Sequence, residues 1–225
     1  MLKKIIIAID GPAGSGKSTA AKNIAEKLGF TYLDTGAMYR AITFLALQKG
    51  IADDVNSVIE LARKISLKLK FENGITRVFV DGIEVTEEIR KPEINSKVSD
   101  ISKIPEVRAE MVKIQKRMGS EGNIIAEGRD VTTVVFPDAD FKIFMTATLE
   151  ERVRRRFKEF QEKNVQISFD EVKANLQMRD EIDSNRTVSP LKKADDALEF
   201  DNSKIGIEEE LNILLDKIEE IRKKV

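Results

Sequence analysis

A glycine-rich segment between an apolar run and an amphipathic helix pattern constrains this chain more than any other feature. Residues 11–18 read Gly-Pro-Ala-Gly-Ser-Gly-Lys-Ser, which satisfies the pattern G-x-x-x-x-G-K-[ST] at every required position. The apolar run 5–9 is typical of a buried strand in a parallel sheet. Apolar residues at helical spacing follow between positions 21 and 28. Strand, loop and helix in this order are the context in which the pattern binds phosphate.

The residue types of this segment explain the binding. Glycines let consecutive backbone N–H groups turn toward one anion, and the positive end of the following helix points at the same place. Lys17 is expected to reach the β- and γ-phosphates, and the Ser18 hydroxyl is expected to ligate Mg²⁺. The residues expected to bind the phosphates of ATP are Gly11, Pro12, Ala13, Gly14, Ser15, Gly16, Lys17, Ser18 and Thr19. We predict that the chain binds a nucleoside triphosphate.

Composition removes several classes of chemistry. The full sequence contains no cysteine and no histidine, so thiol and histidine roles are excluded. Metal-ligand and base roles then fall to carboxylates, or the chemistry needs no strong base. The net charge of −1 and the lack of a basic arm argue against nucleic acid as a partner. No apolar run approaches the ~20 residues that a membrane span needs. We expect no signal peptide and no membrane partner, and a monomer in the cytoplasm.

Strands and helices alternate along most of the chain. Further strands are predicted near 31–33, 123–126, 141–145 and 197–200. Helices are predicted at 37–48, 53–64, 105–118, 149–163 and 169–183, and from Gly206 onward. This alternation predicts a three-layer α/β fold, with a five-stranded parallel sheet covered on both faces. Ligands are then expected at the carboxyl ends of the strands.

The segment 66–85 has a different texture. Apolar and polar residues alternate, and the pairs Asn73-Gly74 and Asp81-Gly82 suit hairpin tips that require a positive φ. We predict a three-stranded antiparallel meander, inserted as a lobe into the α/β chain. A surface hairpin with no role in function is the alternative.

Polar residues gather just beyond two of the predicted strands. They are Asp34 with Thr35, Tyr39 and Arg40, and Glu127 with Arg129 and Asp130. The carboxylates of Asp34 and Glu127 can complete the water shell of Mg²⁺, and the arginines offer planar forks for phosphate. The alternatives are helix-capping or turn carboxylates and surface ion pairs. Thr35 is the residue that we expect to cap the next helix.

Arginines are densest in the two charged helices 149–163 and 169–183. Arg154 and Arg155 follow Glu150 and Glu151 by four residues, which is also typical of a solvated helix face. Arg152 and Arg156 lack such a partner, and Arg179 and Arg186 follow near the end of the next helix. A helix pair of this kind after a phosphate loop predicts a lid that brings positive charge to a phosphoryl group and excludes water. Phosphoryl transfer requires mainly such alignment and neutralisation.

Taken together, these segments resemble the bacterial cytidylate kinases, which are nucleoside monophosphate kinases with a P-loop NTPase fold. The resemblance covers the whole length and is carried by IAIDGPAGSGKST, YLDTGAMYR, EGRDVTTVVFPDA, RDEIDSNR and NRTVSPL. It implies in-line transfer of a phosphoryl group from ATP, with Mg²⁺, to CMP and dCMP. It also implies a core of residues 1–34, 104–148 and 187–225, a monophosphate-binding lobe 35–103 and a lid 149–186.

The resemblance further implies roles for individual residues. The acceptor α-phosphate would be held by Tyr39, Arg40, Arg129 and Arg186, and the remaining CMP contacts would come from Thr35, Ser99, Arg108, Asp130, Arg179 and Asp183. Of these, Ser99, Arg108 and Asp130 would read the cytosine edge, and Arg179 and Asp183 the sugar hydroxyls. The catalytic set would be Lys17, Arg129, Arg152, Arg156 and Arg186. Ser18 would bind Mg²⁺ directly and Asp34 through water. Glu127 departs from the family, since many relatives have aspartate there.

Three other functions are compatible with a phosphate loop. The nearest is a kinase for another small acceptor, such as a different nucleoside monophosphate or shikimate. A GTP-dependent regulatory switch would carry a guanine-reading N-K-x-D motif, which the sequence lacks. A binding module without activity is disfavoured because no position of the phosphate loop is degraded.

Overall fold

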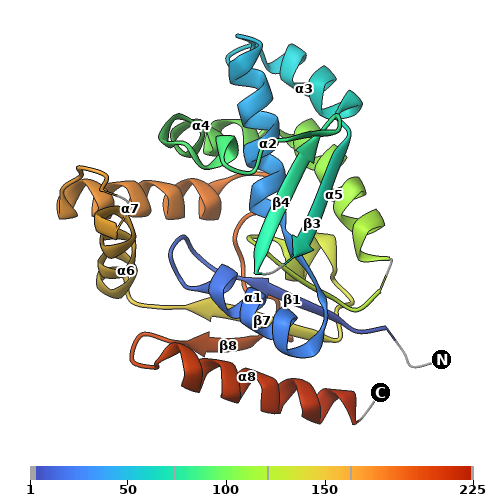
Figure 1. Ribbon diagram of the computed structural model, residues 1–225, viewed down its shortest axis with the longest axis vertical. Coiled ribbons are helices and arrows are strands. Elements are labelled where there is room, and N and C mark those ends of the chain that lie inside the picture. The colour runs from blue at the N-terminus through green and yellow to red at the C-terminus, as the bar shows by residue number, and fades with distance from the viewer. Residues whose placement is uncertain (1–3, 73, 121, 163, 224–225) are drawn as a thin grey trace.

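The phosphate loop starts from the central strand of a parallel sheet in the computed structural model of the chain, which describes residues 4–72, 74–120, 122–162 and 164–223. The strands lie in the order β2-β6-β1-β7-β8. Their bounds are Ile6–Asp10 for β1, Thr31–Asp34 for β2, Ile124–Gly128 for β6, Phe141–Thr146 for β7 and Leu198–Asp201 for β8. All pairings in this sheet are parallel, which confirms the predicted five-stranded α/β fold (Figure 1).

The register places the carboxyl ends of the inner strands side by side. Asp10 at the end of β1 pairs with Gly128 at the end of β6, and Asp34 at the end of β2 pairs with Glu127. The loops that follow these strands therefore leave the sheet at one edge. This edge carries the polar residues that the sequence analysis placed just beyond the strands.

Both faces of the sheet are covered by helices, because alternate side chains of a strand point to opposite faces. Ile7 and Ile9 of β1 pack with α1 (Lys17–Leu28) and α8 (Ile207–Arg222). Ala8, between them, belongs to the other core with α2 (Thr35–Gln48) and α5 (Pro105–Gly119). All three β1 residues are fully buried, as expected for a central parallel strand.

The predicted meander forms a separate antiparallel sheet of β3 (Leu67–Glu72), β4 (Ile75–Val80) and β5 (Ile83–Glu84). Asp81 and Gly82 at its second tip both have positive φ, 50° and 84°, which confirms the predicted tight turn. The first predicted tip includes position 73, which lies outside the described residues. The buried side of the meander packs on α2 and on α3 (Val55–Lys64), so the lobe shares one core with a face of the main sheet.

Three elements were not predicted. The helix α4 (Pro92–Ser102) follows a 3₁₀ turn, η1 (Glu88–Arg90), and a π-helical turn, η2 (Val131–Val135), follows β6. Proline in the first turn and buried apolar residues at 94, 98 and 101 are the signals that mark α4. The turn η2 has no comparable local signal, because it is held by a residue 121 positions earlier.

The arginine-rich helices α6 (Leu149–Glu162) and α7 (Phe169–Asn185) project from the body of the molecule (Figure 1). They pack on each other through a small apolar core of Val153, Val172 and Leu176, which also includes Ala13 of the phosphate loop. The helix pair is therefore in contact with the phosphate loop. Within the described ranges, no helix combines the length and the apolar character that crossing a membrane requires.

Gly11 gives a test of how closely the phosphate loop approaches β7. A Cβ at Gly11 would lie 2.0 Å from the carbonyl oxygen of Met145, whereas a Cβ at Gly122 would meet no atom within 4 Å. Gly11→Ala is expected to lower the free energy of unfolding by on the order of 3 kcal/mol or more. Gly122→Ala, the matched control, should change it by no more than about 0.5 kcal/mol. Urea unfolding followed by circular dichroism measures both, and equal effects would contradict the close approach.

Candidate active site

The phosphate loop has the geometry that its sequence predicts. Gly16 is the N-cap of α1 with φ of 95°, and Gly14 has φ of 75°, so both occupy the left-handed region that favours glycine. Helix α1 begins at Lys17, whose side chain folds back to donate from Nζ to the carbonyl oxygen of Pro12 at 2.8 Å. The loop thus encloses its own lysine at the carboxyl end of β1.

Lys17 lies where a cation is unfavourable. Its side chain is buried, and burial together with the nearby Arg129 lowers its pKa to about 7, although Glu127 and Asp10 oppose the shift. The charged form gains stability when an anion arrives. An anionic ligand is therefore expected to bind here and to raise the pKa of Lys17.

Ser18 and Glu127 form a cluster of oxygen atoms beside the loop. Oε1 of Glu127 accepts hydrogen bonds from Ser18 Oγ at 2.6 Å and from the Tyr32 hydroxyl at 3.0 Å. Burial raises the pKa of Tyr32 well above its ordinary value, so the phenol stays protonated and donates. The longer arm of Glu127 thus reaches the hydroxyl that is the predicted Mg²⁺ ligand. Oxygen donors of this kind suit Mg²⁺.

The part of the chain that the structure describes holds no group of three or more acidic side chains able to bind a metal by itself. Mg²⁺ at nucleotide sites is in general bound by one or two protein groups, phosphate oxygens and water.

Asp34, not Thr35, caps α2. The Asp34 carboxylate accepts from the backbone N–H of Ala37 at 2.8 Å and pairs with Arg40 at 3.0 Å. Thr35 is the first helical residue, and its Oγ1 donates to the carbonyl oxygen of Glu127 at 2.7 Å. The predicted cap was therefore wrong by one residue, because Asp34 has the extended backbone that an N-cap requires.

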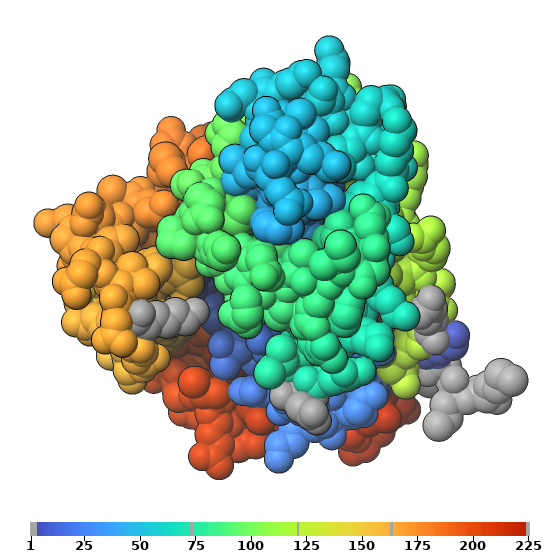
Figure 2. Space-filling view, turned by 45° about the horizontal axis from the view of Figure 1, so that its top comes forward, coloured from blue at the N-terminus to red at the C-terminus, as the bar shows by residue number. Residues whose placement is uncertain are grey.

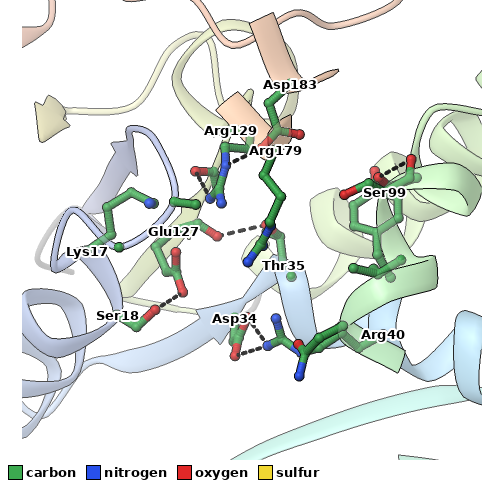
Figure 3. Close-up of a pocket in the computed structure, with 18 of the residues that line it drawn as sticks. Lys17, Ser18, Asp34, Thr35, Arg40, Ser99, Glu127, Arg129, Arg179 and Asp183 are labelled. Atoms are coloured by element: carbon green, nitrogen blue, oxygen red, sulfur yellow. Dashed lines mark hydrogen bonds and ion pairs between the residues drawn. The ribbon is translucent and has the colours of Figure 1, made fainter. Parts of the chain in front are cut away.

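A second charged cluster faces the phosphate loop from α7 and the end of β6 (Figure 3). Nε of Arg129 donates to Asp183 at 2.8 Å, and Arg186 pairs with the same carboxylate at 3.5 Å. Burial opposes ionisation of Asp183, but Arg129 and Arg186 outweigh it and hold the pKa of Asp183 below its ordinary value. Arg179 has a pKa lowered to about 10, through burial and then through Arg129.

The far end of the cleft is formed by Tyr39, Arg108 and Asp130. The Arg108 guanidinium lies 5.1 Å from the centre of the Tyr39 ring and pairs with the Asp130 carboxylate, while Nη2 of Arg186 lies 3.9 Å from Asp130. Ser99, on the unpredicted helix α4, lines the same cleft. Arg108 is only 2% exposed, so this end is sheltered from solvent.

Several donors in the cleft have no acceptor. Among the described residues, Nε of Arg108, Nε of Arg179 and Nη2 of Arg186 are buried without a hydrogen-bond partner. Buried polar atoms are rarely left unsatisfied in native proteins. Guanidinium donors left open inside a cleft indicate a ligand with acceptor oxygens. The cleft is visible in Figure 2 as a hollow between the orange helices α6 and α7 and the green segment that includes α4.

The arginines of α6 differ in where their side chains lie. Arg152 is not among the residues that line the cleft. Its Nε donates to the carbonyl oxygen of Ala147 at 3.1 Å, and its Nη1 donates to the carbonyl oxygen of Ala13 at 3.0 Å. Its guanidinium also pairs with Asp180. Arg156 does line the cleft and pairs with Glu159 at 2.6 Å. Neither arginine has a glutamate four residues before it, as the sequence indicates, and each takes its carboxylate partner from elsewhere.

The two remaining arginines of α6 share one acceptor. Arg155 pairs with Glu151 at 2.7 Å as expected, but Arg154 also pairs with Glu151, at 2.8 Å, rather than with Glu150. Sequence spacing alone does not distinguish between two adjacent glutamates that are both within reach.

Asp10 supports the site from behind, and the sequence analysis did not identify it. It is fully buried at the end of β1, and its carboxylate accepts from the backbone N–H of Val131 at 2.9 Å and from that of Thr132 at 2.7 Å. It also accepts from the Thr132 hydroxyl at 2.6 Å. These bonds hold the turn directly after Arg129 and Asp130. A single aspartate at a strand end carries no local signal for such a contact.

The fold and the cleft together define a class. A phosphate loop on the central strand of a parallel sheet, opposite a cluster of arginines with open donors, is the arrangement of a nucleotide-binding kinase with a phosphate loop. The chain belongs to the cytidylate kinase family, whose model matches residues 7–220.

Relatives in this family match almost the full length. The chain is 49% identical over 222 residues to the cytidylate kinase of Streptococcus agalactiae serotype III, covering 98% of both chains. It is 45% identical over 224 residues to that of Bacillus pumilus, covering 99% of this chain and 100% of the relative. With the enzyme of Caldanaerobacter subterraneus it shares 50% identity over 204 residues, 90% of this chain and 89% of the relative. The family resemblance predicted from the motifs is confirmed.

The lowered pKa of Lys17 predicts proton uptake on ATP binding. Because the pKa is about 7 in the free protein and phosphate charge raises it, binding at pH 8 should take up as much as roughly one proton. Affinity should then fall as pH rises above 7. Calorimetry of ATP binding without an acceptor, in two buffers of different ionisation enthalpy, measures the uptake. Lys27→Met on the exposed side of α1 should keep it and Lys17→Met should lose it; equal uptake by both variants would contradict the assignment.

The raised pKa of Asp10 predicts a pH-dependent stability difference. Burial raises this pKa from 3.8 to about 6, so between these values the unfolded carboxyl loses its proton while the folded one keeps it. The free energy of unfolding should therefore fall with rising pH, relative to Asp10→Asn, by on the order of 3 kcal/mol in total. Urea unfolding of both proteins at several pH values tests this, since other groups cancel in the difference. A difference that stays constant from pH 4 to pH 6 would overturn it.

Proposed function

We propose that this chain transfers the γ-phosphoryl group of ATP to CMP and dCMP, giving CDP and dCDP. The observation that carries the proposal is one cleft in which the phosphate loop faces arginines with open donors. The loop supplies a site for the donor nucleotide, and the arginines supply a site for the phosphate of an acceptor. Membership of the cytidylate kinase family indicates which acceptor this is.

On the donor side, the loop N–H groups and Lys17 bind the phosphates of ATP. Ser18 would hold Mg²⁺ directly, with Asp34 acting through water and Glu127 close by through its bond to Ser18. The metal supplies positive charge that neutralises the phosphate oxygens. The Lys17 side chain is already positioned by the Pro12 carbonyl oxygen before the nucleotide arrives, and the phosphate charge favours its protonated form, so little reorganisation of the side chain is needed.

On the acceptor side, Tyr39, Arg40, Arg129 and Arg186 hold the α-phosphate of the monophosphate, with Thr35 beside them. Arg40 and Arg129 are now occupied by Asp34 and Asp183, at 3.0 and 2.8 Å. A phosphate that enters the cleft competes with these carboxylates for the guanidinium groups. Arg179 and Asp183 bind the sugar hydroxyls.

The base is read by hydrogen-bond polarity. Asp130 accepts from the exocyclic amine of cytosine, and Ser99 and Arg108 donate to the ring nitrogen and the carbonyl oxygen. Uracil presents a carbonyl oxygen where cytosine has the amine, so the Asp130 carboxylate would face another acceptor. A mismatch of this kind costs about 1–3 kcal/mol for each unpaired group.

Transfer itself needs alignment and charge rather than a strong base, which suits a chain without histidine. We propose that residues 149–186 act as a lid, with Arg156 brought toward the transferred group and Arg152 holding α6 to the loop through Ala13. The core is then formed by 1–34, 104–148 and 187–225, and the acceptor lobe by 35–103. We further propose a monomer in the cytoplasm that has neither nucleic acid nor a membrane as a partner.

The rival functions have less support. A kinase for shikimate or another acceptor would not be expected to match cytidylate kinases at 45–50% identity over nearly all of their length. A regulatory GTP switch lacks its guanine-reading motif, as noted above.

The first experiment measures ADP production with ATP and Mg²⁺ and each of CMP, dCMP, UMP, AMP and TMP. We expect strong turnover with CMP and dCMP and weak turnover with the others. Asp130→Asn should reduce the preference for CMP over UMP, because the amide no longer offers two acceptor oxygens. Preference of the wild-type protein for another monophosphate would contradict the base assignment.

Two variants test the roles of the phosphate-binding cations. Lys17→Met and Arg129→Ala are each expected to lower kcat/KM for CMP by roughly 10²–10³-fold, as loss of one donor to developing charge does in other enzymes. Lys27→Met, an exposed lysine of α1, is the matched control and should stay close to wild type. Turnover of CMP at the wild-type rate by a folded Lys17→Met protein would contradict the proposed mechanism.

A further inference from the structure

Asn202 is a buried polar residue to which neither the motif nor the mechanism above gives a role. It follows β8 directly, is 1% exposed, and donates its backbone N–H to the carbonyl oxygen of Thr146 at the end of β7 at 3.0 Å. It therefore lies at the same edge of the sheet as the phosphate loop. Its side chain has two N–H donors and a carbonyl acceptor.

The first donor is bound to the phosphate loop. Nδ2 of Asn202 donates to the carbonyl oxygen of Ser15 at 2.9 Å. Ser15 is fully buried, and its hydroxyl accepts from Lys17 Nζ at 3.3 Å. A Cβ at Gly16 would lie 3.1 Å from Nδ2, so the loop is in direct contact with the amide. Asn202 thus holds the loop residue that touches the catalytic lysine.

The side-chain carbonyl oxygen of Asn202 is bound to the lid helix α6. Oδ1 of Asn202 accepts from Nη1 of Arg155 at 3.0 Å, and its backbone carbonyl oxygen accepts from Nη2 of the same guanidinium at 2.8 Å. Arg155 is fixed in turn by Glu151 on the preceding turn of α6. A two-point contact with a planar guanidinium restrains direction as well as distance. The position of α6 is therefore tied to Asn202.

The second donor is bound to the helix that covers the sheet. Nδ2 also donates to Oε2 of Glu210 on α8 at 2.6 Å, and Glu210 is 5% exposed. Both side-chain donors and the side-chain acceptor of Asn202 are then used, by segments from three separate parts of the chain. Only an amide offers two donors and one acceptor in this shape, since a carboxylate would face two other acceptors.

We propose that Asn202 is a positioning residue that couples the phosphate loop to the lid helices α6 and α7. Its contacts with Arg155 fix the position of α6. Its hydrogen bond to the Ser15 carbonyl oxygen fixes the conformation of the loop around Lys17. The acceptor cluster of Tyr39, Arg108 and Asp130 is attached to other elements. Loss of the amide is therefore expected to weaken the binding of ATP and to leave the binding of CMP nearly unchanged. Measuring KM by turnover of CMP rests on the proposed function, whereas measuring the affinity for ATP by itself does not.

The first test is Asn202→Asp, which keeps the shape and the acceptor for Arg155 but opposes the Ser15 carbonyl and the Glu210 carboxylate. We expect KM for ATP to rise at least ~10-fold and KM for CMP to change less than ~2-fold. Calorimetry without CMP should show a matching loss of ATP affinity. An unchanged KM for ATP would overturn the proposal.

A double variant separates positioning from stability. In Asn202→Asp with Glu210→Gln, the new amide on α8 can donate to the new carboxylate, so the contact with α8 returns while the Ser15 carbonyl stays without its donor. We expect the stability to recover and KM for ATP to stay raised. Recovery of both would show a merely structural role. The double variant also keeps the test possible if Asn202→Asp alone does not fold.

The contact between Asn202 and α6 can be tested with a matched pair of variants. Arg155→Met removes the contact with Asn202, whereas Arg154→Met removes an exposed arginine of the same helix that binds the same glutamate. Arg155→Met should weaken ATP binding and Arg154→Met should not; equal behaviour would overturn the coupling. If the wild-type protein binds ATP but phosphorylates none of the monophosphates, the proposed function fails, and the ATP affinities of these variants still decide the role of Asn202.

Discussion

The parallel pairing of β1 with β6 and β7 is the constraint on which the rest of this structure depends. It sets Asp10 beside Gly128 and beside Phe144, so the phosphate loop and the turn after β6 start at the same level of the sheet. The Asp10 carboxylate then ties the two segments by accepting from the backbone of Val131 and Thr132. A site for donor phosphates and a site for an acceptor come together because neighbouring parallel strands end at one edge.

Charge in the cleft is arranged at a cost to the ligand-free protein. Lys17 and Arg179 are buried cations, and Arg129 lowers the pKa of each after burial does. Asp183 offsets part of this repulsion by pairing with Arg129. The apolar contacts of Leu176 with Val153 and Val172 keep α7 in place despite the charge it presents. Phosphate oxygens would supply the anionic partners that these side chains do not have among the described residues of the free protein, so the folded site is prepared for an anion.

Local patterns were reliable where the chain's own neighbours decide the conformation. The phosphate loop, the turn at Asp81-Gly82 and the strands of the main sheet lie where the sequence analysis predicted them. Predictions failed where two adjacent residues could fill the same role. Arg154 pairs with Glu151 rather than with Glu150, and Asp34 rather than Thr35 caps α2. The helix α4 was missed although proline and its apolar spacing mark it.

The sequence by itself determined the phosphate loop, the alternating α/β plan and the family, because each depends on residue types at short spacings along the chain. Only the tertiary structure decided that Asp10 holds the turn after Arg129, that Glu127 reaches Ser18, and that Asn202 joins the loop, α6 and α8. These contacts span from 8 to 187 positions. They depend on which strands become neighbours and which side chains are buried together, and periodicity within one segment does not encode that order.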